Sequence, residues 1–155
     1  MTRAFRIVPV VAPTRDVADL LSRHADLMRA ETPAESCHAM DAEALFASGA
    51  SIFAARMDTT ILGIAAVKRL DAAHGEIKSM HTRSDARGLG VGAALLQRVV
   101  TEARALGLQR LSLETGSSDM FGPARRLYER HGFSCCGPFA DYTHDPLSVF
   151  MTRRL

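Results

Sequence analysis

Hydrophobic residues in the first third of the chain form one strand-like run and then recur with a helical period. The apolar run at residues 7–11 predicts a short strand. After Thr14, a residue type that caps helices, the apolar positions share one helical face: Val17, Leu20, Leu21, His24 and Met28. A shorter helix is predicted over residues 41–48, because Gly49 follows as a stop signal. The pattern therefore predicts one strand followed by two helices.

The next three segments have the character of strands. Residues 51–55 and 61–68 are apolar runs separated by the turn-forming residues 58–60, which predicts an antiparallel hairpin. Residues 76–82 alternate in polarity after Gly75, and we expect them to be a third strand of the same sheet.

The second half of the chain alternates between helices and strands. Apolar positions fall on one helical face from residue 90 to 106, and Gly107 follows as a stop signal. Residues 111–113 predict a strand, and a further helix is predicted from Pro123 to the glycine at 132. Two closing strands are predicted at 133–136 and 147–152. The resulting order is β, two helices, three strands, helix, strand, helix, two strands, which is an α/β (α+β) chain.

The composition supports one domain and excludes several classes of protein. With 155 residues, 47% hydrophobic and 23% charged, we expect a single domain over residues 1–155. The formal net charge of +2 arises from acidic and basic residues that are mixed along the chain, which gives no nucleic-acid-binding face. No window approaches the roughly 18 apolar residues of a membrane span, and the start does not resemble a secretory signal. We expect a cytoplasmic protein that binds neither nucleic acid nor membrane.

Cysteines and histidines give no sign of a metal site. Cys37, Cys135 and Cys136 fit neither a disulfide framework nor a zinc spacing, and their strand-like neighbours predict that the adjacent pair is buried. The histidines have no paired spacing that would hold a metal ion, so no metal is expected. His24, on an apolar stripe, is expected to be a hydrogen-bonded packing residue.

The segment that carries chemistry is a glycine-rich helix start. The predicted strand that ends near Thr82 is followed by the turn 83–87 and by glycines at 88, 90 and 92. Unshielded backbone N–H groups at the positive end of a helix dipole bind anions, and glycines let a pyrophosphate approach closely. Arg83 and Arg87 can add charge-assisted hydrogen bonds. An anion site is predicted here.

Two other interpretations of these glycines remain open. They can simply close a turn. Residues 88–93 also satisfy the loose G-x-G-x-x-G/A dinucleotide fingerprint, and Glu114 follows about 20 residues later. The preceding antiparallel strands and the short remaining chain argue against the dinucleotide interpretation.

Two motifs resemble those of the GNAT acetyltransferases. The family signature Arg/Gln-x-x-Gly-x-Gly/Ala is matched by residues 87–92, and a later Ala-x-x-Leu-Tyr element ending in Gly-Phe is matched by residues 124–133. The motifs occur in order and about 30 residues apart, and the resemblance covers most of the chain.

The resemblance implies a fold, a cosubstrate and a set of binding residues. The fold is a GNAT-like splayed mixed β-sheet of about six to seven strands flanked by about four helices. Acetyl-CoA lies between the two central strands, with its pyrophosphate on the glycine turn and its pantetheine arm along one strand backbone. The residues implied are Met80, His81, Thr82, Arg87, Gly88, Leu89, Gly90, Val91, Gly92 and Ala93. One departure is Phe121, where many members have an Asn that bonds the cofactor arm; Ser117 or Ser118 are possible replacements.

Transfer of an acetyl group to an amine requires a neutral nucleophile and a protonated leaving thiol. Tyr128 is the candidate acid. Glu76 is favoured as the base, while His81, Glu114 and Asp119 are alternatives. Strict strand alternation turns His81 to the face opposite Glu76. These residues predict an enzyme rather than a noncatalytic acetyl-CoA or CoA sensor, the alternative function.

The acceptor is expected to be a primary amine of a small molecule or peptide. Its selectivity is expected to lie in the first two helices and in the loop 138–146. Asp141, Tyr142 and Asp145 of that loop are able to attract a cationic amine, although loop solvation explains them equally well. A homodimer is possible for such a family member.

Overall fold

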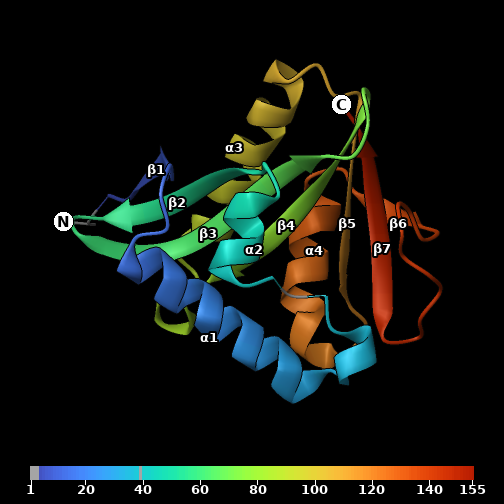
Figure 1. The fold of residues 1–155 in the computed structure, drawn as a ribbon, viewed down its shortest axis with the longest axis horizontal. Helices are drawn as coiled ribbons and strands as arrows, with labels where there is room; N and C mark the ends of the chain where they lie inside the picture. Colours follow the sequence, from blue (N-terminus) through green and yellow to red (C-terminus); the bar gives the residue numbers. More distant parts are fainter. Residues whose placement is uncertain (1–3, 39) are drawn as a thin grey trace.

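The computed structural model describes residues 4–38 and 40–155. In this part of the chain seven strands form one mixed sheet in the order β1-β2-β3-β4-β5-β7-β6, with helices against both faces (Figure 1). The strands are β1 (Arg6–Pro9), β2 (Ser51–Met57), β3 (Thr60–Arg69), β4 (His74–Thr82), β5 (Arg110–Gly116), β6 (Ser134–Cys136) and β7 (Ser148–Arg154). The α-helices are α1 (Arg15–Glu31), α2 (Ala42–Ala47), α3 (Val91–Ala105) and α4 (Gly122–Arg130). The short 3-10 turns are η1 (Ala34–Ser36), η2 (Ser84–Ala86) and η3 (Asp119–Phe121). The predicted fold class and element order are confirmed.

The sheet has one break in its pairing, and this break creates the site. Strands β1 to β4 form an antiparallel meander, and β5 pairs antiparallel with β7 over seven positions, Arg110 to Gly116. Between them, β4 and β5 run parallel and are paired at only three positions, the last of which joins Glu76 to Ser112. Beyond that point the two strands separate. A sheet with a single parallel pair is not the doubly wound sheet that binds dinucleotides at its switch point.

Two apolar cores fix the helices on opposite faces of the sheet. α1 and α2 bury Val17, Leu21 and Leu45 against Ile64 and Ala66 of β3. On the other face α3 and α4 cover the alternate β3 positions, and this core includes Ala65, Val67, Leu95, Val99 and Tyr128. Fully burying a Leu or Val side chain stabilises a fold by about 1.5–3 kcal/mol. Both walls of the opening between β4 and β5 are therefore anchored by packed helices.

β4 carries a bulge at Ser79, whose φ is +56°. Lys78 and His81 are three residues apart, yet they pair with β3 residues that are two apart. The extra residue reverses the alternation of the strand. The prediction that His81 faces away from Glu76 is therefore wrong: both side chains lie on the face covered by α1.

Other details correct the sequence-based picture. Thr14 occupies the N-cap of α1, but its hydroxyl donates to Asp16 Oδ1 (2.6 Å), and its side chain accepts no hydrogen bond from a backbone N–H of the helix. Cys135 is exposed and Cys136 half-buried, because β6 is the edge strand; the prediction of a buried pair is wrong. His24 packs in a largely buried position as expected, but its Nδ1 has no hydrogen-bond partner within residues 4–38 and 40–155. Among the described residues, no helix combines the length and apolar character needed to cross a membrane.

Candidate active site

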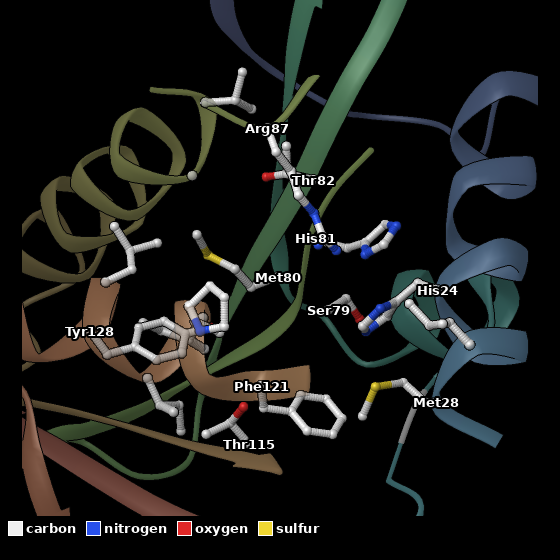
Figure 2. Close-up of a pocket in the computed structure, with 18 of the residues that line it drawn as sticks. His24, Met28, Ser79, Met80, His81, Thr82, Arg87, Thr115, Phe121 and Tyr128 are labelled. Atoms are coloured by element: carbon white, nitrogen blue, oxygen red, sulfur yellow. The ribbon is translucent and has the colours of Figure 1, made fainter. Parts of the chain in front are cut away.

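A cleft of about 970 Å³ lies where β4 and β5 separate. Its walls are β4, β5, α1, the start of α3, and α4, and Figure 2 shows their side chains converging on the opening. Binding pockets for small molecules and cofactors are commonly about 300–1,000 Å³. The volume of this cleft is therefore at the upper end of that range.

The wall at the start of α3 is made mainly of backbone. Gly88 and Gly90 both have φ of +82°, a left-handed conformation that glycine adopts at little cost. The Ala94 N–H bonds to the Gly90 carbonyl (3.1 Å), so the N–H groups of the preceding helical residues have no intrahelical acceptor. A Cβ on Gly92 would lie 3.1 Å from Leu127 Cδ2 of α4, so a larger residue would require the Leu127 side chain to shift by a few tenths of an ångström. These groups form an anion cradle at the positive end of a helix dipole.

Most of the predicted cofactor residues line the cleft. Those that do so are Met80, His81, Thr82, Arg87, Gly88, Gly90, Val91, Gly92 and Ala93. Leu89 does not, and its side chain is 49% exposed. Arg87 has no carboxylate partner in the described part of the chain, whereas Arg83 pairs with Asp85 (2.7 Å). Of the two arginines, Arg87 is the one free to meet an anion.

The end of β4 divides its side chains between the two sides of the cleft. Met80 and Thr82 face α3, where both approach the Cβ position of Gly92, and His81 points toward His24 of α1 (Figure 2). The His24 and His81 ring centroids are 4.7 Å apart. Burial lowers the pKa of His81. Burial also lowers the pKa of His24, and the neighbouring His81 adds to this effect, so that the His24 pKa is about 4. Both imidazoles are therefore neutral near pH 7.

Tyr128 reaches the cleft from α4 and is 5% exposed. Its ring packs edge-on against Phe133, with centroids 5.9 Å apart. Burial, followed by the charge of Glu114, raises the pKa of Tyr128 well above its ordinary value. The phenol is therefore protonated near neutral pH and offers an O–H donor.

Glu76 is buried, and its Oε2 atom has two polar partners. The Tyr142 hydroxyl donates to Glu76 Oε2 (2.5 Å), and Lys78 Nζ lies 3.5 Å from the same oxygen. Lys78 also donates to the Tyr142 hydroxyl (3.3 Å). Tyr142 comes from the β6–β7 loop, and Ser36 of η1 donates to Asp145 of that loop. These contacts join β4, η1 and the β6–β7 loop, and Glu76, Lys78 and Tyr142 among them line the cleft.

Glu114 differs from Glu76 in its surroundings. It lies on β5 opposite Phe150, lines the cleft, and has no ion-pair partner in the part of the chain described here. Burial is the main cause that raises the pKa of Glu114 to about 7; the nearby charge of Glu76 adds to it, and a hydrogen bond from Ser148 opposes it. The Glu114 carboxyl therefore titrates near neutral pH.

Two further sequence-based candidates lie outside the cleft lining. Asp119 is exposed on η3, and Ser117 donates its hydroxyl to the Pro146 carbonyl (2.8 Å). Phe121 does line the cleft, and a Cβ on Gly116 would fall 2.1 Å from its ring. Phe121 therefore covers the end of β5 with an apolar surface, and no amide takes its place there.

Sequence reasoning did not identify the roles of Lys78, His24 and Ser36. Their partners lie far away along the chain: the Lys78–Tyr142 and Ser36–Asp145 hydrogen bonds join residues 64 and 109 positions apart, and no local pattern signals them. No group of three or more His, Cys, Asp or Glu residues suited to a metal ion occurs within residues 4–38 and 40–155.

The splayed sheet and its glycine-rich helix start define an acyltransferase fold. Residues 19–133 match the acetyltransferase (GNAT) family. The chain is 45% identical to the uncharacterized N-acetyltransferase YsnE of Bacillus subtilis, over 91% of this chain and 93% of that protein. It is 38% identical to the uncharacterized N-acetyltransferase YedL of Escherichia coli, over 90% and 87% respectively. The chain therefore belongs to the GNAT family and is an N-acetyltransferase.

Solved structures agree with this fold. A Klebsiella pneumoniae protein assigned as an acyl-CoA N-acyltransferase superposes with a TM-score of 0.80 at 24% identity, over 99% of both chains. A GNAT acetyltransferase of Elizabethkingia anophelis, solved with acetyl-CoA bound, gives a TM-score of 0.72 at 21% identity, over 97% of this chain and 98% of that one.

Proposed function

We propose that the cleft binds acetyl-CoA and transfers its acetyl group to a primary amine of a small molecule or peptide, by direct attack in a ternary complex. The observation that carries this proposal is the position of the α3 N-terminus at the opening between β4 and β5. Acetyl-CoA, when bound, supplies an acetyl group activated as a thioester. Residues 87–93, with Arg87 and the free N–H groups of α3, would hold its pyrophosphate.

The separation of β4 and β5 supports a binding role for residues 80–82. β5 pairs with β4 only as far as Glu76, so the β4 edge beyond the bulge has backbone groups without a strand partner on that side. A ligand that covers these backbone N–H and C=O groups removes them from water, and they then require hydrogen-bond partners. The amide groups of a pantetheine arm would satisfy them.

Glu114 and Tyr128 are suited to the two proton transfers. A general base works best with a pKa near the operating pH, and that of Glu114 is about 7. Glu114 would accept the proton that the acceptor amine loses. Tyr128 would donate its phenolic proton to the departing sulfur, and burial keeps that proton in place beforehand.

Glu76, the base favoured from the sequence, has contacts better suited to a positioning role. Its carboxylate is held by Tyr142 and Lys78 and is 3% exposed. Its charge contributes to raising the pKa of Glu114, so Glu76 would help to tune the base.

Thermal unfolding in the presence of acetyl-CoA, CoA or NADH tests the cosubstrate. A ligand at a hundredfold excess over its Kd stabilises a protein by about 2.7 kcal/mol, which raises the Tm by about 5–10 °C for a chain of this size. We expect this rise with the CoA species alone. A rise in Tm with NADH alone, or no rise in Tm with any of the three ligands, would overturn the proposal. Release of free CoA in the presence of an amine panel then measures transfer.

A further inference from the structure

We propose that the acceptor is a monoamine with an apolar body, and that the cleft discriminates against a second ammonium group. This inference rests on the proposed acetyl transfer and specifies its acceptor class. It follows from three properties of the acceptor side of the cleft: its apolar surface, the occupation of its carboxylates and an unpaired cation.

The acceptor side of the cleft is mostly apolar. Figure 2 shows Met28, His24 and Phe121 around the space beyond Ser79. The apolar lining residues on this side are Leu20, Leu27, Met28, Met40, Met120 and Phe121. Flexible methionine side chains fit apolar ligands of varied shape. The neutral His24 and His81 rings add polar atoms to this surface without adding charge.

None of the carboxylates that line the cleft is left to hold a second ammonium group. They are Glu76, Asp85 and Glu114. Glu76 is occupied by Lys78 and Tyr142, and Asp85 pairs with Arg83. Glu114 lies on β5 at the reacting end of the cleft, where the reacting amine itself needs it, and its pKa of about 7 weakens its charge near neutral pH. Selective binding of a polycation requires free carboxylates, because a buried charge without a partner is costly.

Arg23 adds positive charge on the same side. It lies on α1 next to His24 and lines the cleft, and it has no carboxylate partner among the described residues. An unpaired guanidinium repels an ammonium group and attracts a carboxylate. An acceptor with a distal carboxylate is therefore tolerated better than one with a distal amine.

Three amines of equal chain length test this inference: hexylamine, 6-aminohexanoate and 1,6-diaminohexane. With acetyl-CoA saturating, we expect kcat/KM for hexylamine to exceed that for 1,6-diaminohexane, counted per amine, by about tenfold or more. The value for 6-aminohexanoate should lie between them. Equal values, or a preference for the diamine, would overturn the inference while leaving acetyl transfer intact. Failure of acetyl-CoA to bind in the thermal assay would instead remove the proposed function.

Arg23→Glu provides the second arm of the test. It should reduce the preference for hexylamine over the diamine at least about threefold, because it places a carboxylate where the second ammonium would lie. Arg15→Glu is the matched control: it makes the same charge change on α1, at an exposed position outside the cleft lining. An equal change in both variants would indicate a general charge effect and would overturn the assignment to Arg23.

Discussion

The two walls of the cleft are built in different ways. The α3 wall presents backbone N–H groups and glycines from one short segment, residues 87–93. The α1 wall presents side chains from α1, the bulged strand β4 and the β6–β7 loop, which meet only in the folded chain. A backbone site suits a ligand portion that stays constant, such as a pyrophosphate, because it does not depend on side-chain identity. A side-chain wall can change with the acceptor without disturbing that site.

The largest effect is expected where the two walls meet, at Glu114. Glu114→Gln should lower kcat by about 10²- to 10³-fold, since a general base contributes about that much, with little change in the acetyl-CoA Kd. In the wild type, kcat/KM should rise with pH through about 7, because the base acts only when deprotonated. This part of the profile should be absent in the variant.

Glu76→Gln is the companion variant for Glu114. It should lower kcat less and shift the rise to lower pH, because the charge that helps to raise the Glu114 pKa is removed. Full turnover by Glu114→Gln together with loss of turnover in Glu76→Gln would return the base to Glu76.

Tyr142→Phe tests the α1 wall. It removes the hydroxyl that donates to buried Glu76. A hydrogen bond to a charged group contributes about 1.5–3 kcal/mol, so the Tm should fall by about 3–12 °C. The KM for the amine should also rise while the acetyl-CoA Kd stays unchanged. A change in acetyl-CoA affinity as large as that in KM would show that the two walls are not independent.

Gly90→Ala tests the α3 wall by strain alone. A residue with a Cβ at φ +82° costs about 1–2 kcal/mol, and the Cβ itself has open space. We expect a rise of about tenfold in the acetyl-CoA Kd, measured by calorimetry. Gly49→Ala is the matched control, because Gly49 has φ of +78° and open space but follows α2 and does not line the cleft. Equal Kd values for both variants and the wild type would contradict a backbone cradle.

The smallest effect is expected at the N-terminal end of α1, outside the cleft. Arg56 donates to Asp16 (2.6 Å) and is the main cause that lowers the Asp16 pKa to about 2. Because the folded-state pKa is depressed, the stabilisation is complete above about pH 4 and is lost as the pH falls toward 2. The Asp16 side chain is 39% exposed, so Asp16→Asn should cost at most about 1 kcal/mol at pH 7, or about 2–4 °C in Tm. A difference in Tm that persists undiminished at pH 2 would contradict this account.

The sequence predicted the elements well and the faces of β4 less well. Helix period, stop signals and turns located four α-helices and seven strands, since these signals act within a few residues. The face predicted for His81 from strand alternation was wrong, because the bulged residue Ser79 turns the side chains that follow it on β4 to the opposite face of the sheet. The cysteine pair was misjudged because a strand pattern does not reveal which strand lies at the edge.

The glycine-rich α3 wall of the cleft could be predicted from the sequence alone, because a glycine-rich turn and the start of a helix are local and contiguous. Which cleft carboxylate has a cationic partner depends on the folded chain. Glu76 and Glu114 have the same chemistry, and they differ because Tyr142 and Lys78 engage one while burial without an ion pair raises the pKa of the other. Burial and charge at a site depend on segments brought together by folding, and these are not encoded in any one stretch of the chain.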